Sequence, residues 1–476
     1  MESIIKETFV TFKQIEQEMY KKKCHEGQEE TKALLEQYDK YLFDNRDTKK
    51  FRDKGTRKTV IKTVYGEVEY SRHVYQITDE NGARHCIFLL DEILQMERVG
   101  KFSENFIDHL ANEITTQSFR GCARSLSETT GQTVSGMGVW NIVQKLGERI
   151  DEEERKLSAA NEKGLVIGKK EVPVLFEEID GVYIRMQRED RKTNPKGIAE
   201  MKVGIAYDGW VKEREGRYSL DGKVAFAGFS KAPKFHATLE AKIAAEYNLC
   251  ETQLRILNGD GADWIKKVPD PDIIFQLDPY HRNKEVMKKI PYKNAREIIN
   301  DFFSEDDTEG LFEYLEKYRN SLTEDEEIKN AEELIQYFND NKDGLIQYRQ
   351  RENLTIPRSP EGLEYRNLGT MENHIYSIVA QRMKHQHRSW KKTSATNLAK
   401  ILAKKSEGKL YEVTRPAILT GFSQEVLEKI QSKCLTAAKS GKRIGKGYEY
   451  PVQGSIPSIE HALRGDPVKL FKMAGY

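Results

Sequence analysis

Three acidic residues stand at positions where a carboxylate can do chemistry: Asp180, Asp260 and Glu372. Asp180 interrupts an alternating apolar stretch and shares the parity of its apolar side chains, so its charge needs a partner, a hydrogen bond or a metal. Asp260 follows a short apolar run, at the strand end where α/β sheets usually hold ligands. Glu372 falls in the first turn of a later amphipathic segment. The alternative for Asp180 is an edge-strand side chain facing water, because carboxylates are mostly exposed.

These three carboxylates predict a site for hard divalent cations. Oxygen ligands suit Mg²⁺ or Mn²⁺, which also keep waters and phosphate oxygens in their coordination shell. Two such ions can activate one oxygen and stabilise the leaving oxygen in phosphodiester chemistry, so we expect two ions. The chain contains 76 Asp and Glu residues, and the prediction therefore depends on the order and placement of these three. Asp263, one helical turn beyond Asp260, is the rival for the second ligand.

The composition excludes several classes of protein. Lys and Arg number 77 against 76 Asp and Glu, so the net charge indicates no partner, although local clusters can. The 5 cysteines are far apart and form no Cys-x-x-Cys pair, which supports neither a zinc knuckle nor a disulfide framework. The first residues lack the apolar core of a signal peptide, and no apolar run approaches the roughly 18 residues of a membrane span. We therefore expect a reduced, cytoplasmic protein with no membrane partner.

The segments around the acidic residues predict an α/β fold with a mixed sheet. Turns at Asp208-Gly209 and Asp221-Gly222 indicate that the first three strands pair antiparallel. An amphipathic helix over 234–248 separates these strands from two more. The five expected strands cover residues 171–187, 201–207, 223–229, 254–257 and 273–277. The core would comprise residues 171–282 and 361–400.

Between the last expected strand and Glu372, the sequence predicts only helices. Residues 283–360 hold no convincing strand, and apolar positions recur at helical spacing until Pro357 and Pro360 close the block. We expect this block to be an all-helical insertion. A further helix over 369–388 would carry Glu372 in its first turn, with Thr370 as its N-cap.

The N-terminal third is expected to form a helical region over 1–57, a small β region over 58–100 and a helix-turn-helix over 101–150. The helix-turn-helix prediction rests on two short helices joined by a Gly-containing turn, and an ordinary helical hairpin is the alternative. Residues 151–170 are expected to be a helix end and a linker at a domain boundary. The second helix would place the following residues near a major groove: Gly136, Met137, Asn141 and Lys145.

Two basic clusters are candidates for contacting nucleic acid. The first spans residues 49–62 and is either a solvated linker or a phosphate-contacting patch. The second spans 382–392 around Trp390, and basic residues interleaved with an aromatic one suit a nucleic-acid groove. A solvated face with Trp390 as a core anchor is the alternative, and a basic region over 401–476 follows. The candidate DNA-binding residues are Arg120, Arg124, Asn141, Lys145, Arg382, Lys384, Arg388 and Trp390.

Four motifs follow one another: Glu-Ile-Asp180-Gly-Val-Tyr, Gly-Asp260-Gly-Ala-Asp-Trp-Ile, Asp278-Pro-Tyr-His281, and Gly-Thr-Met-Glu372-Asn with Arg-Met-Lys and Ser-Trp390 after it. With this set the chain resembles, over essentially its whole length, the ISLre-type bacterial insertion-sequence transposases. That group has long been catalogued as an uncharacterised protein family and is similar to the Mutator-like transposases. The resemblance implies an α/β fold with an RNase H-like mixed-sheet catalytic core, an all-helical insertion before the Glu, and a helical N-terminal DNA-binding region.

The resemblance also implies roles for individual residues. Asp180, Asp260 and Glu372 would direct metal-dependent strand nicking and strand transfer. Asp278 and His281 match a D-x-x-H motif of the superfamily. His281 would then stand near the scissile phosphate or hold a strand end, whereas a surface His after a strand is the alternative. Asp278 would be structural.

We therefore expect a DNA transposase that cleaves and transfers strands at the ends of an insertion sequence. Its partners would be terminal inverted repeats and target DNA. A homo-oligomer, a dimer or larger, is expected because two ends must be held together. The alternatives are a non-catalytic, sequence-specific DNA-binding protein derived from such an element, and a glycoside hydrolase that uses two carboxylates.

Overall fold

The computed structural model describes residues 10–94, 102–131, 133–266, 270, 272–352, 354–384, 388–414 and 428. The chain divides into two compact units, Met1–Gly421 and Phe422–Tyr476, and every element named below belongs to the first unit. Most of the basic region expected over 401–476 lies outside the described residues, as do residues 385–387 of the second basic cluster. None of the described helices is long and apolar enough to span a lipid bilayer.

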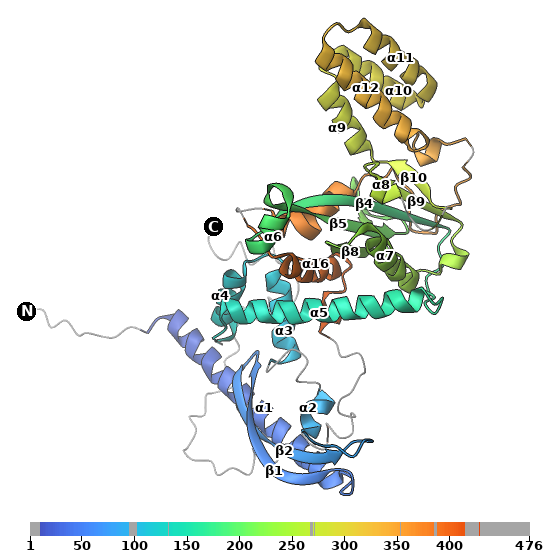
Figure 1. Cartoon of the computed structure of the whole chain (residues 1–476). Coiled ribbons are helices and arrows are strands. Elements are labelled where there is room, and N and C mark those ends of the chain that lie inside the picture. The colour runs from blue at the N-terminus through green and yellow to red at the C-terminus, as the bar shows by residue number, and fades with distance from the viewer. Residues whose placement is uncertain are drawn as a thin grey trace, which may run out of the picture. The chain divides into compact units, whose positions relative to one another are not determined.

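A five-stranded mixed sheet lies at the centre of the first unit, with the strand order β10-β9-β4-β5-β8. β4 pairs antiparallel with β5, and β5 pairs antiparallel with β8, whereas β9 is parallel to β4 and β10 is parallel to β9. Figure 1 shows β4 within this sheet, flanked by helices. The predicted α/β fold with a mixed sheet is therefore confirmed. The strands are β4 (Val174–Arg185), β5 (Ile198–Tyr207), β8 (Val224–Gly228), β9 (Leu254–Gly259) and β10 (Ile274–Leu277).

Alternate side chains of β4 enter two different hydrophobic cores. Leu175 and Ile179 pack with the apolar side of α7 (Ala232–Glu246). Phe176 and Val182 belong to the larger core, which also contains the apolar side chains of α16 (Lys392–Ser406). Asp180 has the parity of this second set, so it lies on the face of β4 that the C-terminal helices cover.

A short hairpin between β5 and β8 was not predicted from the sequence. It consists of β6 (Trp210–Arg214) and β7 (Arg217–Leu220). The backbones of Trp210 and Glu364 exchange two hydrogen bonds, so the hairpin holds the segment that returns from the helical insertion. The indole of Trp210 packs against Phe176, with ring centroids 5.2 Å apart. The strands are short and largely polar, which hides their alternation in the sequence.

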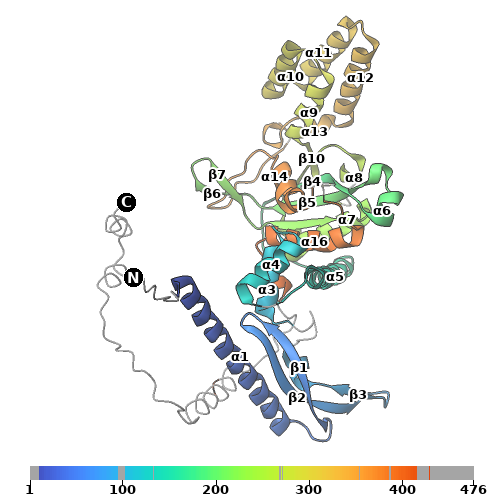
Figure 2. The same cartoon turned by 90° about the vertical axis from the view of Figure 1, so that its left-hand side faces the viewer.

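The expected helical insertion is present as a separate layer with its own core, and Figure 2 shows α10, α11 and α12 packed side by side. Ile299, Leu315 and Phe338 are buried in this core. The helical part ends with a 3-10 turn at Tyr348–Gln350, and the described residues between 351 and 360 form no helix, contrary to the prediction. The insertion contains α9 (Pro279–Lys289), α10 (Lys293–Glu305), α11 (Thr308–Ser321), α12 (Asp325–Asp340) and α13 (Lys342–Leu345).

The N-terminal region consists of one long helix and a three-stranded antiparallel sheet. The sheet occupies most of the small β region expected over 58–100. Its first strand begins earlier than expected, so the basic cluster at 49–62 lies mainly on a strand and not in a linker. The elements are α1 (Phe12–Asn45), β1 (Arg52–Thr63), β2 (Gly66–Thr78), β3 (Arg84–Ile87) and α2 (Leu89–Leu94).

Three helices follow: α3 (Glu104–Ile114), α4 (Phe119–Thr130) and α5 (Gly136–Asn161). The predicted pair of helices around a Gly turn is confirmed, and Gly131 ends α4 with a φ of 66°, a conformation that glycine adopts without steric strain. The helix end and linker expected over 151–170 are confirmed, because α5 continues to Asn161 and the chain leaves the helix there. Glu154 explains the extension, since its carboxylate is buried and paired with Lys400 of α16.

The helix that carries Glu372 is shorter and less regular than predicted. It runs as α14 (Met371–Ile375), a π-helical turn (Tyr376–Ala380) and α15 (Gln381–Met383). Thr370 makes no side-chain hydrogen bond to the first turn, so it is not the conventional N-cap that the sequence suggested. The π-helical turn is a rare feature that is often found at functional sites.

Candidate metal-binding and nucleic-acid-binding site

Asp180 occupies the middle of β4, the central strand of the sheet. Its side chain is 7% exposed, and Oδ1 accepts the backbone N–H of Gly181 at 2.6 Å. Burial raises the pKa of Asp180 to about 6; the charge of His281 opposes this rise, and the charges of Asp260 and Asp278 add to it. An edge-strand carboxylate facing water is thereby excluded for the described structure.

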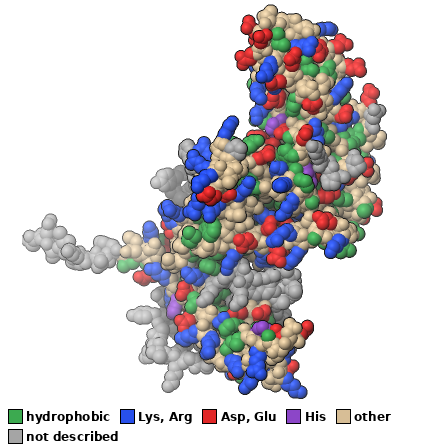
Figure 3. Space-filling model, viewed as in Figure 1, with side chains coloured by type: hydrophobic (Ala, Val, Ile, Leu, Met, Phe, Trp, Pro, Cys, Tyr) green, Lys and Arg blue, Asp and Glu red, His purple; other side chains and the backbone are tan. Residues whose placement is uncertain are grey.

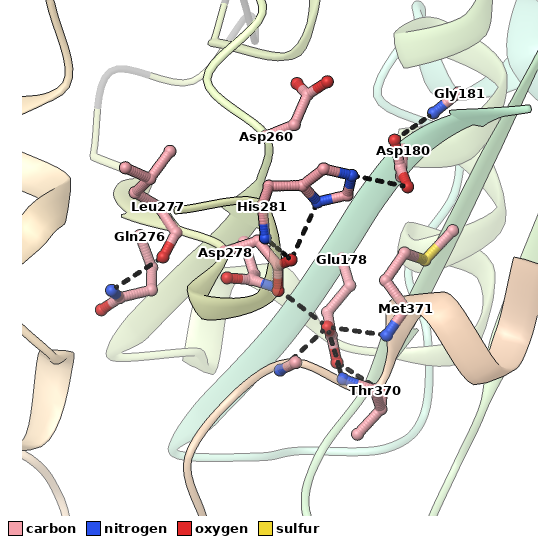
Figure 4. Close-up of polar contacts among 12 residues, drawn as sticks. Glu178, Asp180, Gly181, Asp260, Gln276, Leu277, Asp278, His281, Thr370 and Met371 are labelled. Carbon is pink, nitrogen blue, oxygen red and sulfur yellow. Dashed lines mark hydrogen bonds and ion pairs between the residues drawn. The ribbon is translucent and has the colours of Figure 1, made fainter. Parts of the chain in front are cut away.

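His281 is presented to Asp180 by the start of α9. Asp278 is the N-cap of this helix, and its Oδ2 accepts both the backbone N–H of His281 at 3.2 Å and the ring Nδ1–H at 2.9 Å. The three-residue spacing of the motif allows both bonds, because an N-cap side chain faces the third helical residue. The other ring nitrogen, Nε2, lies 3.7 Å from Oδ2 of Asp180 (Figure 4).

The charges around His281 favour its protonated form. Burial alone would lower the pKa of His281, but the hydrogen bond to Asp278 and the charges of Asp180 and Asp260 outweigh burial and raise it. For Asp278, burial would raise the pKa, but hydrogen bonds from His281 and Asn258 outweigh it and lower the pKa. The imidazole therefore lies between acidic groups that stabilise its positive charge.

Asp260 directly follows the end of β9. Its Oδ1 accepts the N–H of Ala262 at 2.9 Å, and its carbonyl oxygen accepts the hydroxyl of Tyr337 from α12 at 2.8 Å. Figure 4 shows Asp260 on the loop beside His281. The charge of Asp260 acts on both Asp180 and His281, whereas the rival Asp263 is exposed at the start of α8 (Asp263–Lys266). This favours Asp260 over Asp263 as the second acid of the site.

The loop that carries Asp260 depends on a glycine. Gly261 has a φ of +88°, and a Cβ at this position would lie 2.5 Å from Oδ1 of Asn341. Nζ of Lys266 donates to the carbonyl of Asp340 at 3.0 Å. The helical insertion therefore fixes the loop at the end of β9 and, with it, the position of Asp260.

Glu178, two residues before Asp180, is a member of the site that the sequence analysis missed. The structure buries it completely. Its carboxylate accepts the hydroxyl of Tyr207 at 2.6 Å and that of Thr370 at 2.5 Å. It also accepts the backbone N–H groups of residues 369, 370 and 371 at 3.0 to 3.3 Å. Glu178 thus takes over the capping of α14 from Thr370.

The side-chain amide of Asn258 links Glu178 to Asp278 and, through Asp278, to His281. Nδ2 of Asn258 donates to Glu178 and to Asp278, each at 3.0 Å. Burial raises the pKa of Glu178, while the hydrogen bonds from Thr370 and Tyr207 oppose that rise. The result is a continuous series of hydrogen bonds from His281 to the first turn of α14. Glu178 has the parity of Asp180 in the sequence, but nothing there indicates that its partners lie between 29 and 193 residues away.

The structure does not bring Glu372 together with the other two predicted ligands. Its side chain is exposed in the first turn of α14. Among the described residues, no three His, Cys, Asp or Glu side chains are placed so that they could hold one metal ion. What the structure does bring together is Asp180 and His281, with Asp260 near enough for its charge to act on both. The helix of Glu372 is tied to the same strand through Glu178.

Two of the eight predicted DNA-binding residues, Arg382 and Trp390, are buried, which corrects the prediction that their side chains face DNA. Nε of Arg382 donates to the carbonyl of Ile114 at 2.9 Å, and its guanidinium lies 5.2 Å from the ring centroid of Trp390. The indole N–H of Trp390 donates to the carbonyl of Met383 at 3.0 Å. Arg382 therefore connects α15 to the end of α3, and Trp390 is held against the end of α15 inside the protein.

The other predicted residues have accessible side chains. Asn141 and Lys145 lie one turn apart on the exposed face of α5, together with Met137. Arg120 and Arg124 are exposed on α4, and Gly136 at the start of α5 is half-buried against Arg120. Lys384 is exposed, and Arg388 is half-buried with Nη1 donating to the carbonyl of Arg382. The face of α5 proposed for a major groove is therefore open.

Comparison with known proteins identifies one family. The model of the uncharacterised protein family UPF0236 matches residues 5–416 of the chain. A UPF0236 protein of Caldanaerobacter subterraneus subsp. tengcongensis is 25% identical over 394 residues, which cover 81% of this chain and 76% of the relative. A UPF0236 protein in the vanSb 3′ region of Streptococcus gallolyticus is 25% identical over 377 residues, which cover 74% and 73%. Several Caldanaerobacter names combine more than one locus, and many copies in one genome are typical of mobile elements.

Proposed function

The chain belongs to the uncharacterised protein family UPF0236, and we propose that it is a DNA transposase. It would cleave and transfer strands at the ends of an insertion sequence with the help of divalent metal ions. The observation that carries the proposal is the contact of Asp180 on the central strand with His281 at a helix N-terminus, 3.7 Å apart. Asp260, at the end of the neighbouring strand, is near enough for its charge to act on both. The repeated occurrence of relatives in one genome also supports a mobile element.

The order of the strands supports an RNase H-like core. Three antiparallel strands that neighbour one another in the sheet, β4, β5 and β8, are followed by α7 and by two strands that are parallel to β4 on its other side. The first acid lies on the first of these strands, the second acid follows the fourth strand, and a helical insertion precedes Glu372. This is the arrangement that the resemblance to Mutator-like transposases implies.

Asp180 and Asp260 fit a hard divalent cation. Their oxygens are the ligands that Mg²⁺ and Mn²⁺ prefer, and the burial that raises the pKa of Asp180 leaves a negative charge in need of a counter-charge. The ions would supply an activated oxygen nucleophile and a charge that stabilises the leaving oxygen. Glu372 is exposed in the first turn of α14 and apart from these two carboxylates, so its part in the ligand set stays a prediction from the resemblance.

The other groups would orient the DNA around these carboxylates. His281 can donate from Nε2 to a phosphate oxygen, because Asp278 fixes the ring through Nδ1. Asn141 and Lys145 on the open face of α5 would contact the major groove, and Arg120 the backbone beside it. A homo-oligomer would hold two ends together.

The test is cleavage of duplexes that carry the ends flanking the gene. Asp180→Asn and Asp260→Asn remove a negative oxygen with little change of shape. We expect each to lower Mg²⁺-dependent cleavage about 100-fold or more while duplex affinity stays near that of the wild type. Variants that cut as well as the wild type would overturn the assignment.

A non-catalytic DNA-binding protein is the second candidate. It is favoured by the exposed position of Glu372 and by the lack, within the described ranges, of three side chains placed to share a metal. For such a protein, Asp180→Asn and Asp260→Asn should bind the DNA ends as tightly as the wild type. The wild type itself should cleave the ends with none of the divalent cations.

A further inference from the structure

The chain between β4 and β5 forms a basic insertion. It contains α6 (Arg188–Thr193) and a 3-10 turn at Pro195–Gly197. Residues 185–197 include five cationic and two acidic side chains, in a protein whose total charge is only +1. Figure 3 shows Lys and Arg side chains gathered over α6. Positive charge is therefore concentrated here although the composition of the chain is balanced.

A second basic segment lies against this insertion. The N–H of Trp390 donates to the carbonyl of Arg185, and the N–H of Gln187 donates to the carbonyl of Trp390, both at 2.9 Å. The N–H of Lys392 donates to Asp190 of α6 at 2.8 Å. Within the described part of residues 382–392 there is no acidic side chain, so the two segments add their positive charges at one surface.

The same surface continues to the helices proposed to bind DNA. The ring of Phe119, at the start of α4, lies 6.2 Å from that of Trp390, and Arg120 follows it on the exposed side. Lys391 lines a groove of about 620 Å³ together with Asn141 and Lys145 of α5. Cationic side chains thus extend from α4 and α5, past residue 391, to α6.

Several of these cations have no acidic partner among the residues that the structure describes. Arg185, Arg188, Arg191 and Lys196 are exposed, and none of them takes part in an ion pair there. Arg188 and Lys196 also have positive φ angles, 53° and 57°, which L-residues rarely adopt. Strained conformations of this kind are often kept where a side chain has to be presented to a ligand.

We propose that Arg185, Arg188, Arg191, Lys196 and Lys391 form a phosphate-binding surface, called the α6 surface, which holds the backbone of duplex DNA. The α6 surface rests on the proposed function and adds to it a contact that α4 and α5 do not make. Arg suits this role because its guanidinium pairs with phosphate oxygens through two parallel hydrogen bonds. The duplex would run from the open face of α5 to the insertion that extends the strand of Asp180.

The test measures the salt dependence of binding by the full chain to a duplex of about 30 base pairs of arbitrary sequence, since backbone contacts are independent of sequence. The variant carries Arg185→Gln, Arg188→Gln and Arg191→Gln. Its control carries Lys293→Gln, Lys317→Gln and Lys329→Gln, exposed residues of α10, α11 and α12 whose loss changes the charge equally. Thermal melting checks that both variants are folded.

We expect the α6 variant to reduce the slope of log K against log salt by about 2 to 3, and to bind roughly 100-fold more weakly near 100 mM salt. The control should keep the wild-type slope. If the wild type binds duplex DNA and the α6 variant shows the same dependence of log K on log salt, the α6 surface is wrong and the proposed function still stands. If the wild type shows no binding to duplex DNA at any salt concentration, the proposed function is contradicted as well. If the wild type binds phosphatidylserine vesicles more strongly than duplex DNA, the α6 surface would be a membrane-binding surface, and the proposal that it holds duplex DNA would be overturned.

Discussion

The hydroxyl of Thr370 donates to Oε1 of Glu178 at 2.5 Å, although 192 residues separate them in the chain. Thr370 directly precedes the helix that carries Glu372, and Glu178 lies two residues before Asp180 on the central strand. The contact therefore ties the third predicted acid to the strand of the first. It fixes the start of α14 even though the side chain of Glu372 itself is exposed.

Glu178→Gln is expected to destabilise the protein and to impair cleavage together. The amide keeps the shape but offers an NH₂ group where the carboxylate accepts N–H and O–H groups, and each buried donor left without an acceptor costs about 1–3 kcal/mol. Thermal melting should show the loss, and Mg²⁺-dependent cleavage should fall. Glu309→Gln, on the exposed side of α11, serves as the control. An unchanged melting temperature for Glu178→Gln would contradict the role of this carboxylate.

Gly261→Ala should displace Asp260. The new Cβ would meet Oδ1 of Asn341 at 2.5 Å in addition to the strain of a positive φ. We expect at least about a tenfold loss of cleavage, because small displacements of a catalytic group are costly. Gly362→Ala is a matched control, since Gly362 has a φ of +84° with open space around it. If both variants lose the same amount of cleavage activity, the loss comes from backbone strain and not from a displacement of Asp260.

Acid should unfold the protein partly through Glu407. Burial would raise the pKa of this carboxyl, but the positive charges of Lys242 and Lys404 outweigh burial, so the pKa lies below its ordinary value of 4.5. A lowered folded-state pKa contributes stability above the unfolded value and loses it as the pH falls through the folded value. Glu407→Gln should therefore flatten the decline of stability below pH 4.5, as followed by urea unfolding at several pH values.

At neutral pH, Glu407→Gln should lower stability by up to about 3–5 kcal/mol, because the buried Lys242 would lose its partner at 2.9 Å and keep only Glu154 at 3.7 Å. A variant whose stability fell with acid as steeply as that of the wild type would show that Glu407 does not contribute to acid unfolding.

Arg382→Ala should lower stability without changing DNA binding. The variant removes the donor to the carbonyl of Ile114 and leaves a cavity beside Trp390, for an expected loss of about 2–4 kcal/mol. Lys384→Ala, at an exposed position two residues later, should show the opposite pattern, with a normal melting temperature and a smaller salt slope. A folded Arg382→Ala variant with a reduced salt slope would restore Arg382 to the DNA-contacting residues.

Much of the core could be predicted from local patterns. The alternation around Asp180 defines β4, and the short apolar run before Asp260 defines β9. The N-cap at Asp278 was not among the predictions, although the three-residue spacing of its motif matches a helix turn. Each of these features depends on neighbours within a few residues, and such information is present in the sequence itself.

Other features depend on partners that are distant in the chain. The buried position of Glu178 follows from Tyr207, Asn258 and Thr370, and no spacing rule connects these residues. Likewise, Glu154 and Lys400 form a buried pair although each stands in a segment rich in charges. The basic composition around Trp390 left both a nucleic-acid groove and a core anchor open, and the structure confirms the core anchor, with the guanidinium of Arg382 also inside.

The most direct measurement of the proposed site is the binding of Mn²⁺ to the full chain, followed by electron paramagnetic resonance without DNA. We predict that the wild type binds Mn²⁺ and that Asp180→Asn and Asp260→Asn each weaken this binding about tenfold or more, because each removes an oxygen ligand. Asp263→Asn, the exposed rival one turn beyond Asp260, should bind like the wild type. Wild-type affinity in Asp180→Asn and Asp260→Asn would contradict the account.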